Sequence, residues 1–302
     1  MADRKPNPKK QARAEKAQRH TEQMAARFGK EVERSLAGVQ RLEAPVTSEV
    51  EGRVPEVRVM AADAVAAILE NGRGRAEYCD LAVLDFASFT NPGGGYIRGS
   101  WAQEEALCAE SFLYNVLEKQ GDWYGANRRR NINCNLYRNR ALVVPKVRFA
   151  REKIHAYADV LVVAAPNARR AREEYKVADD ALVRAMRDRI RFALDIVDAL
   201  GHKQVVLGAW GCGVFGWEAE LVSELFREDL ASGSHGIELA IFAVPRDRFN
   251  ENLACFEHAL STFPERNQVS FADALAERRA AEQAAAAVEE DDEEEDDWRK
   301  YL

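Results

Sequence analysis

The alternation of strand-like and helix-like patterns along the chain restricts the folds that it can adopt. Six short apolar runs have the composition of buried strands, and they lie at 56–60, 81–84, 142–144, 160–165, 205–207 and 237–244. Helical patterns lie between several of these runs, as at 179–200, where Leu182, Met186 and Ile190 are spaced to share one face. Two further helices are predicted at 218–231 and 250–262. This order predicts an α/β sandwich around a mixed or parallel sheet.

The two ends of the chain differ from its middle in charge. Residues 1–45 carry 11 Lys/Arg against 6 Asp/Glu, whereas residues 266–302 carry 5 against 12. We interpret 1–45 as a basic extension, disordered over its first ten residues, with a helix at 11–36 that docks on the body. The apolar stripe of this helix consists of Ala17, Met24, Phe28 and Val32. We interpret 266–302 as an Ala/Glu-rich helix and a disordered tail, in which 289–297 are all acidic. The main domain is therefore placed at 46–265.

Composition excludes several classes of protein. No apolar run reaches the length of a membrane span, and the N-terminus lacks the apolar segment of a secretory signal, so we expect a cytoplasmic protein (nuclear in a eukaryote) without a membrane partner. The five cysteines are widely spaced and contain no C-x-x-C, and the five histidines are scattered, so neither a disulfide framework nor a metal site is indicated. The middle of the chain carries 27 Lys/Arg against 32 Asp/Glu, which does not favour duplex nucleic-acid binding.

A glycine loop between a strand and a helix is the first motif that indicates chemistry. The strand pattern at 81–84 continues into Asp85-Phe86-Ala87-Ser88 and then Asn91-Pro92-Gly93-Gly94-Gly95. Seven residues later, Gln103-Glu104-Glu105 begins a helix whose apolar face contains Ala109, Phe112, Leu113, Val116 and Leu117. A strand, a glycine-rich loop and a helix N-terminus in this order predict an anion-binding loop. Taken alone, a tight turn before a helix with an acidic first turn would explain the same motif.

A second glycine-rich loop follows the strand at 205–207. Its sequence at 208–216 is Gly-Ala-Trp-Gly-Cys-Gly-Val-Phe-Gly, and its four glycines suit a second phosphate-binding loop that faces the first. Together the two motifs resemble the bacterial branch of the poly(ADP-ribose) glycohydrolases, whose signature is a glycine triplet, six to eight residues and Gln-Glu-Glu. The resemblance covers roughly residues 12–262. It implies a macrodomain-like three-layer α/β/α sandwich with a mixed central sheet.

The resemblance also implies roles for the residues of both loops. Glu105 is expected to be the catalytic acid, Glu104 to bind the distal ribose or the leaving ribose hydroxyl, and Asn91 to clamp a hydroxyl of the distal ribose. Further substrate contacts are expected from Gly93, Gly94, Gly95 and Gln103. The second loop is expected to bind the diphosphate through Gly211, Cys212, Gly213 and Val214, and Phe215 is expected to pack by the ribose and adenine side of the ligand. Phe215 could instead pack in the core, and Cys212 is interpreted as a buried loop cysteine because no histidine is near it in sequence.

The geometry of a helix adds one constraint to the glutamate pair. Adjacent side chains on a helix point about 100° apart, so Glu104 and Glu105 are not expected to form a symmetrical acid–base pair. The helix N-terminus lowers a carboxyl pKa, whereas a neighbouring carboxylate raises it, and the sequence leaves this balance open.

Two further positions have alternative interpretations. Asp63 stands where macrodomains often have an acid that contacts adenine, and a helix N-cap explains it equally well. Trp217 stands where the bacterial enzymes usually have Asn, so it could change the cap of the following helix or the contact with the distal ribose.

The expected function is exo-type hydrolysis of the ribose–ribose bond, which releases ADP-ribose from poly(ADP-ribose) chains on modified proteins. No cofactor is implied, because an acid, a water molecule and the loops suffice, and a monomer is expected. Two alternatives are a non-catalytic ADP-ribose-binding macrodomain and a hydrolase of mono-ADP-ribosyl linkages on protein or nucleic acid. The acidic tail could in addition bind a basic partner.

Overall fold

The structure is a computed structural model that describes residues 7–246, 251–277 and 280. The predicted acidic stretch at 289–297 lies outside these residues. The strands are β1 (Gln40–Glu43), β2 (Glu56–Met60), β3 (Leu81–Phe86), β4 (Arg140–Arg151), β5 (Ile154–Val163), β6 (Gln204–Leu207) and β7 (Leu239–Ala243). The α-helices are α1 (Pro8–Ala37), α2 (Ala64–Asn71), α3 (Gln103–Ala109), α4 (Leu113–Leu117), α5 (Gly121–Arg130), α6 (Ala168–Tyr175), α7 (Asp179–Ala199), α8 (Ala219–Ala231) and α9 (Asn252–Leu260). None of the described helices combines the length and hydropathy needed to cross a membrane.

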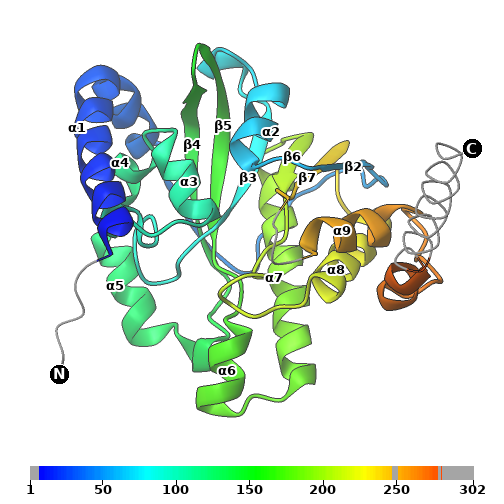
Figure 1. The fold of residues 1–302 in the computed structure, drawn as a ribbon. Helices are drawn as coiled ribbons and strands as arrows, with labels where there is room; N and C mark the ends of the chain where they lie inside the picture. The colour runs from blue at the N-terminus through cyan, green and yellow to red at the C-terminus, as the bar shows by residue number, and fades with distance from the viewer. Residues whose placement is uncertain (1–6, 247–250, 278–279, 281–302) are drawn as a thin grey trace, which may run out of the picture.

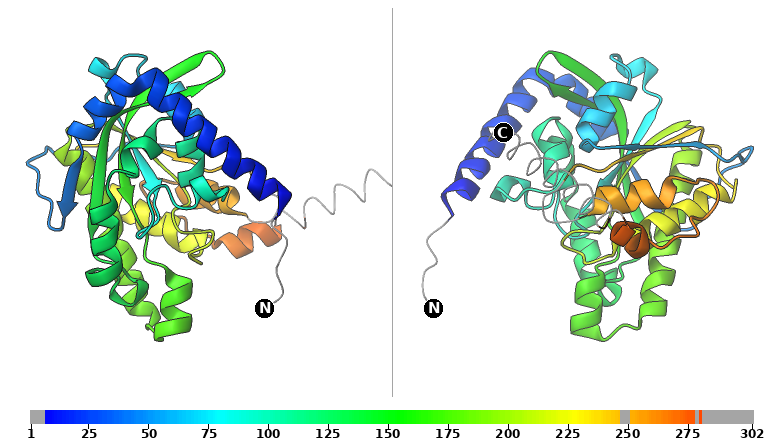
Figure 2. Two further views of the ribbon diagram at one scale, coloured as in Figure 1. Left: turned by 90° about the vertical axis from the view of Figure 1, so that its left-hand side faces the viewer. Right: turned by 45° about the vertical axis from the view of Figure 1, so that its right-hand side comes forward.

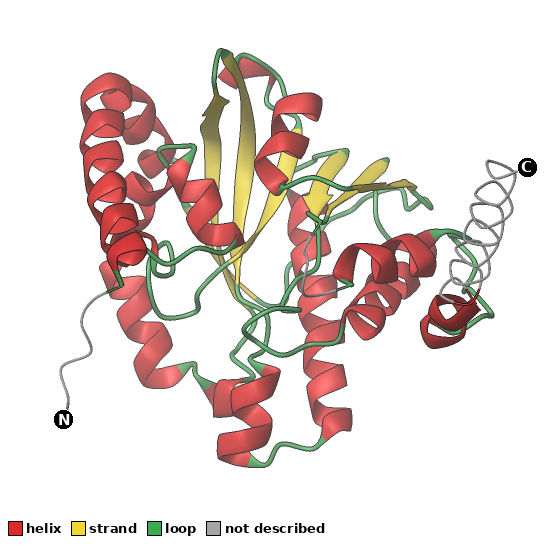
Figure 3. Ribbon diagram, viewed as in Figure 1, coloured by secondary structure: helices red, strands yellow, loops and turns green. Residues whose placement is uncertain are grey.

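The seven strands form one mixed sheet in the order β1-β4-β5-β3-β6-β7-β2 (Figure 1). Strands β5, β3, β6, β7 and β2 pair with one another in parallel, whereas β4 pairs antiparallel with both β5 and β1. Helices cover both faces of the sheet (Figure 3), and a separate hydrophobic cluster lies on each face. One cluster contains side chains of α1 to α5, and the other contains side chains of α6 to α9. The predicted three-layer α/β/α sandwich with a mixed sheet is therefore confirmed.

The predicted strands all form, and the central strands β3, β6 and β7 do so because they are buried apolar runs. In β3, for example, Leu81 and Val83 face one cluster, and Ala82 and Leu84 face the other. The short edge strand β1 has no such run, since three of its four residues are exposed, and the sequence did not predict it. It pairs with β4, so residues 40–43, which were assigned to the N-terminal extension, belong to the sheet.

Helix α1 docks on the body beside the first glycine loop (Figure 2). Its predicted stripe makes the contact: Ala17 is buried, and Met24, Phe28 and Val32 pack against the cluster beneath them. The Arg13 guanidinium donates a hydrogen bond to the Gly99 carbonyl at 2.8 Å. The expectation of disorder over the first ten residues was wrong for residues 7–10, because the Asn7 side chain caps the helix and Pro8 suits its first turn.

The helix that the sequence predicts after Gln103 is interrupted. Helix α3 ends at Ala109 and α4 begins at Leu113, so the residues between them leave the helical path. The Ala150 amide donates a hydrogen bond to the Glu110 carbonyl, and Ser111 forms an isolated bridge with Phe149. The single-helix prediction was wrong because backbone pairing with β4 replaces the helical hydrogen bonds at this point.

Candidate active site

The two glycine loops leave the same edge of the sheet. Strands β3 and β6 are parallel neighbours, so 87–102 and 208–218 both begin at the carboxyl ends of strands, where open α/β sheets bind ligands. Aromatic rings connect the loops. Phe89 stacks on Tyr137 with 4.3 Å between ring centroids, and Tyr137 meets Phe215 edge-on at 6.4 Å. The structure therefore brings together two motifs that are more than 100 residues apart in sequence.

Gln103 joins α3 to the end of β3. The Ala87 amide donates to the Val163 carbonyl, so the backbone groups of Ala87 point toward β5. Because the direction alternates along a strand, the backbone groups of Leu84 and Phe86 point toward β6. Pairing between β3 and β6 has stopped by then, at Val83. The Gln103 side chain takes the vacant positions: its Nε2 donates to the Leu84 carbonyl and its Oε1 accepts from the Phe86 amide, each at 2.9 Å. Gln103 thus fixes the start of α3 and is not free to contact a substrate through these atoms.

The side chains of Glu104 and Glu105 are buried, with exposed fractions of 3% and 7%. Glu104 Oε2 accepts a hydrogen bond from the Ser88 amide at 2.7 Å, and Glu105 Oε1 accepts one from the Gly95 amide at 2.8 Å. A Cβ atom placed on Gly94 would lie 2.7 Å from both of these oxygens. The expectation that the two side chains diverge was therefore incomplete, because the loop folds over the helix N-terminus and brings both oxygens beside Gly94.

The glycine triplet positions the two glutamates. The Gly95 amide is committed to Glu105, and the Gly94 amide donates to the Asn91 carbonyl. Gly94 has φ of +59°, in the left-handed region that favours glycine, and the nearby carboxylates leave no room for a side chain. These two amides therefore donate to acceptors within the protein. The sequence had instead predicted that this loop binds an anion.

The second loop has several free backbone amides. The amides of Gly211, Gly213, Val214 and Phe215 donate to no residue that the structure describes. Val214 is 73% exposed at the tip, whereas Phe215 is half-buried and packs against the hydrophobic clusters, so both interpretations of Phe215 have support. A loop with several unengaged amides suits the diphosphate of a nucleotide ligand.

Cys212 has the properties of a buried loop cysteine. Burial raises the pKa of its thiol to about 12, with a smaller contribution from Cys255. The Sγ atom lies 3.7 Å from the Trp210 carbonyl, to which it donates a weak hydrogen bond. A thiol that stays protonated at neutral pH is a poor nucleophile, in agreement with the sequence interpretation.

Burial has the largest effect on the pKa of the Glu104 carboxyl. It raises the pKa of this carboxyl well above its usual value, and the nearby Asp85 raises it further, although amide hydrogen bonds oppose the shift. The pKa of the Tyr124 hydroxyl is likewise raised by burial and then by Glu104 and Asp85. For Glu104, therefore, desolvation outweighs the hydrogen bonds from the backbone amides.

Asn91 is fixed by a residue that the sequence analysis missed. The Arg128 guanidinium, from the end of α5, donates to the Thr90 carbonyl and to Asn91 Oδ1, the latter at 3.1 Å. Asn91 Nδ2 in turn lies within hydrogen-bonding distance of the hydroxyls of Ser88 and Thr90. Arg128 follows Asn91 by 37 residues, and only the basic run at 128–130 could have drawn attention to it.

Tyr137, between the two loops, is also held by a residue that the sequence did not indicate. The buried Arg189 guanidinium of α7 donates to the carbonyls of Leu136, Tyr137 and Ala164 and to Asn139 Oδ1. Burial lowers the pKa of Arg189 to about 10. Arg189 stands at a core-facing position of α7, so nothing in the helix pattern distinguishes it as a functional residue. Its role becomes visible only from the carbonyls that converge on its guanidinium.

Trp217 anchors the second loop and does not cap α8. Its side chain is 4% exposed, its Nε1 donates to the Pro166 carbonyl at 2.7 Å, and its ring packs against Gly211. The cap position of α8 is Glu218, which makes no side-chain capping bond. The presence of Trp217, where the resembled enzymes usually have Asn, therefore affects how the second glycine-rich loop is attached to the segment that follows β5.

Replacing Trp217 by Phe should destabilise the protein. The Trp217→Phe change leaves the buried Pro166 carbonyl without its donor, which costs about 1–3 kcal/mol. We expect the free energy of unfolding, measured by urea denaturation, to fall by this amount. The matched control is Trp101→Phe at a residue that is 62% exposed, where stability should not change. Equal stability of both variants would contradict this role of Trp217.

Asp63 caps a helix, as one of its two interpretations predicts. Its Oδ1 accepts a hydrogen bond from the Ala66 amide at 2.8 Å at the start of α2. Its carboxylate also pairs with Arg151, which in turn binds Glu110 at the end of α3. Contact with adenine stays a prediction for this residue.

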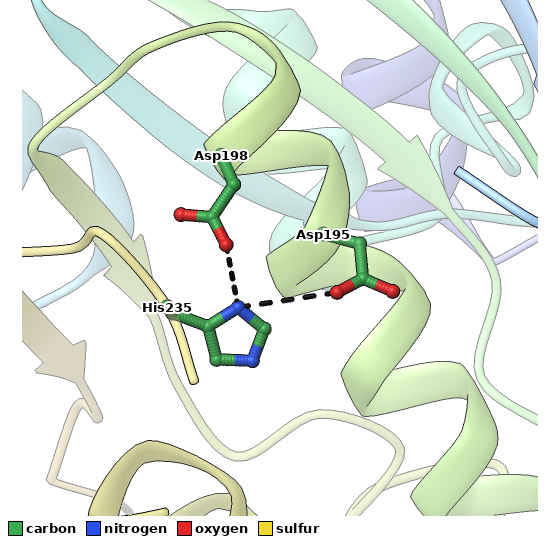
Figure 4. Close-up of side chains that lie close together, drawn as sticks. All are labelled: Asp195, Asp198 and His235. Atoms are coloured by element: carbon green, nitrogen blue, oxygen red, sulfur yellow. Dashed lines mark hydrogen bonds and ion pairs between the residues drawn. The ribbon is translucent and has the colours of Figure 1, made fainter. Parts of the chain in front are cut away.

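A histidine and three aspartates form a buried cluster on the opposite face of the sheet. His235 Nδ1 lies 2.7 Å from Asp198 and 4.0 Å from Asp195 (Figure 4), and its Nε2 lies 3.3 Å from Asp229. Burial alone would lower the pKa of His235, but the hydrogen bonds to Asp198 and Asp229 overcome this effect and raise it to about 9. Asp195, Asp198 and His235 have the spacing of a metal site. Since both ring nitrogens face carboxylates and the ring is protonated at neutral pH, we interpret the cluster as an ion-pair network.

This cluster predicts a loss of stability in mild alkali. The folded pKa of His235 exceeds the usual histidine value of 6.5, so its stabilisation is complete below about pH 6.5 and is lost as the pH rises through about 9. We expect the free energy of unfolding to fall by a few kcal/mol over this range. In His235→Gln, stability should be lower at neutral pH and this fall should be absent. His155→Gln, at an exposed histidine, should behave like the wild type. An unchanged pH dependence in His235→Gln would refute the assignment.

Comparison with known proteins agrees with the class of site that this geometry defines, a nucleotide-binding α/β/α sandwich with buried acids. The catalytic-domain model of the microbial-type poly(ADP-ribose) glycohydrolases (PARG) matches residues 9–152. No curated protein matches the chain. The matched residues and the solved structures described next show that the chain is similar to the microbial-type PARG family.

Two bacterial enzymes provide the similar structures. The Thermomonospora curvata PARG bound to the inhibitor ADP-HPD is 26% identical, with a TM-score of 0.67, and the match covers 82% of this chain and 98% of that one. The same enzyme in a second structure has a TM-score of 0.69 at the same identity and coverage. The Deinococcus radiodurans PARG in complex with ADP-ribose is 26% identical, with a TM-score of 0.67, and the match covers 76% of this chain and 97% of that one.

Proposed function

We propose that the protein is a poly(ADP-ribose) glycohydrolase that cleaves the ribose–ribose O-glycosidic bond and releases ADP-ribose. The observation that carries this proposal is the convergence of two buried glutamate oxygens beside Gly94, at the edge of the sheet from which a loop with unengaged amides also leaves. Carboxyl groups cleave glycosidic bonds, and loop amides bind phosphates. The similar enzymes were solved with ADP-ribose and with ADP-HPD, which supports the same ligand here.

In the proposed mechanism Glu105 transfers the protons. Its carboxylic acid protonates the departing 2′-oxygen as the bond to the distal ribose breaks, which leaves an oxocarbenium-like ribose. The resulting Glu105 carboxylate then takes a proton from the attacking water, so the acid is regenerated. The Gly95 amide holds Glu105 in place for both steps.

The other site residues bind the substrate. Glu104, held by the Ser88 amide, binds the distal ribose, and Asn91, held by Arg128, clamps a ribose hydroxyl. The amides at 211–215 receive the diphosphate, and Phe215 contacts the ribose and adenine side of the ligand. We propose that the terminal unit of a chain on a modified protein is bound in this way, so that cleavage is exo-type.

The test is a time course of poly(ADP-ribose) cleavage by the purified protein, followed by chromatography. Exo cleavage predicts that ADP-ribose is released from the first time points while the chains shorten gradually. Oligomers that precede ADP-ribose would instead indicate internal cleavage. Binding of ADP-ribose in calorimetry without any release would indicate a binding module. Faster release from a mono-ADP-ribosylated protein than from the polymer would reassign the substrate.

A further inference from the structure

A third carboxyl group lies buried behind the glutamate pair. Asp85 is 0% exposed, and neither of its carboxyl oxygens has a hydrogen-bond partner among the residues that the structure describes. Two other buried atoms of the site share this property, namely Glu104 Oε1 and the Tyr124 hydroxyl. Buried polar atoms without partners destabilise a fold by about 1–3 kcal/mol each. Three such groups in one place therefore require an explanation.

The backbone places Asp85 directly under the first turn of α3. Side chains alternate along β3, so Asp85 lies on the same face as Val83, among the cluster that contains Cys108 and Tyr124. The Gln103 side chain is bonded to the peptide groups on either side of Asp85, at Leu84 and Phe86. The next residue, Glu104, is bonded to the Ser88 amide, three residues beyond Asp85. Asp85 and Glu104 are thus buried neighbours, close enough for Asp85 to raise the pKa of the Glu104 carboxyl.

The hydrogen-bond donors determine which of the two carboxyl groups keeps a proton. Two neighbouring buried carboxyl groups cannot both ionise at neutral pH. Glu104 receives the Ser88 amide, a donor that stabilises its ionised form, whereas Asp85 receives none. Burial, followed by the nearby Glu105, raises the pKa of Asp85 well above its usual value, which agrees with this assignment. Burial raises the pKa of both groups, but only Glu104 has a donor that favours its ionised form, so Asp85 keeps the proton and Glu104 is the member of the pair that ionises.

We propose that Asp85 is a protonated positioning residue that donates a hydrogen bond to Glu104 Oε1 and so orients the carboxylate that binds the distal ribose. Glu104 then has one donor on each oxygen, from Ser88 and from Asp85, and cannot turn away from the sugar. Asp85 acts through Glu104 and touches no substrate itself. The inference rests on the proposed glycohydrolase function for its catalytic consequence, but the protonation state of Asp85 is independent of that function.

Two substitutions by residues of similar size distinguish a positioning role of Asp85 from a purely structural role. Asp85→Asn keeps a neutral donor for Glu104, so kcat for poly(ADP-ribose) should stay within roughly three-fold of the wild type. Asp85→Leu removes the donor, and kcat should fall about 10-fold or more, the effect of one lost hydrogen bond to a charged group. Asp85→Leu leaves Glu104 Oε1 without this donor, so it should be less stable than Asp85→Asn, but circular dichroism should still show a folded protein. A residue with a purely structural role would change stability without separating the kcat values of the two folded variants.

The matched control is Asp80→Asn, just before the start of the same strand, where the aspartate pairs with Arg73 at the surface. Its kcat should equal that of the wild type. Equal kcat in Asp85→Leu and Asp85→Asn would overturn the positioning role.

Two measurements test whether Asp85 is protonated, and neither requires turnover of the substrate. An aspartate in the unfolded chain ionises near pH 4, whereas folded Asp85 keeps its proton, so wild-type stability should fall relative to Asp85→Asn as the pH rises above about 4. The infrared spectrum of the wild type at neutral pH should contain the carbonyl band of a neutral carboxylic acid that Asp85→Asn lacks. If the wild type releases no ADP-ribose, the proposed function fails while these readouts still decide the state of Asp85. A wild type that is more stable than Asp85→Asn at neutral pH, without this band, would show an ionised Asp85 and overturn the inference.

Discussion

Glu105→Gln should lower kcat for poly(ADP-ribose) by at least about 100-fold while leaving ADP-ribose affinity nearly unchanged. A general acid contributes about 10²–10⁴-fold to a rate, and glutamine cannot transfer the proton. The substitution should preserve the local structure, because the amide oxygen of Gln can still accept the hydrogen bond from Gly95. The loss should therefore appear in kcat, measured by release of ADP-ribose, and not in the dissociation constant, measured by calorimetry.

A control on the same helix makes this result specific. Glu110 is the C-cap residue of α3 and pairs with Arg151, away from the glutamate oxygens beside Gly94, so Glu110→Gln should retain wild-type kcat. If Glu105→Gln kept its activity while Glu104→Gln lost it, the acid would be Glu104 and the roles proposed for the two residues would be exchanged.

Gly94→Ala should also abolish most of the activity, for a geometric reason. An alanine here adopts an unfavourable φ of +59°, and its Cβ would lie 2.7 Å from one oxygen of each glutamate. Both carboxylates must then move, and displacements on the order of 1 Å cost about 100-fold in rate. We expect kcat/KM to fall by this factor, with circular dichroism showing a folded protein.

Gly201→Ala is the control for backbone strain. Gly201 has φ of +72°, and a Cβ there would meet nothing within 4 Å, so this variant carries similar strain without the collision. Both variants should lose about 1–2 kcal/mol of stability from the left-handed backbone, but only Gly94→Ala should lose activity. Similar activity in the two variants would mean that the carboxylates do not converge on Gly94 as described.

Much of the fold was readable from the sequence because its signals are local. The central strands are apolar runs, and the long helices α1 and α7 have periodic apolar faces, so each could be predicted from neighbouring residues. Strand β1 could not, since it is short and exposed and exists only through its pairing with β4. The break between α3 and α4 was equally invisible, because β4 supplies the competing hydrogen bonds.

For the site, the sequence by itself determined which residue types are available: two glycine-rich loops after two strands and a pair of glutamates at a helix start. The tertiary structure decided how they are used. Only the folded chain shows that Gly95 binds Glu105, that Arg128 fixes Asn91, and that Asp85 lies buried behind Glu104. These relations depend on contacts between segments that are distant in sequence and on burial, which changes the protonation of a carboxyl group. No local pattern encodes either of them.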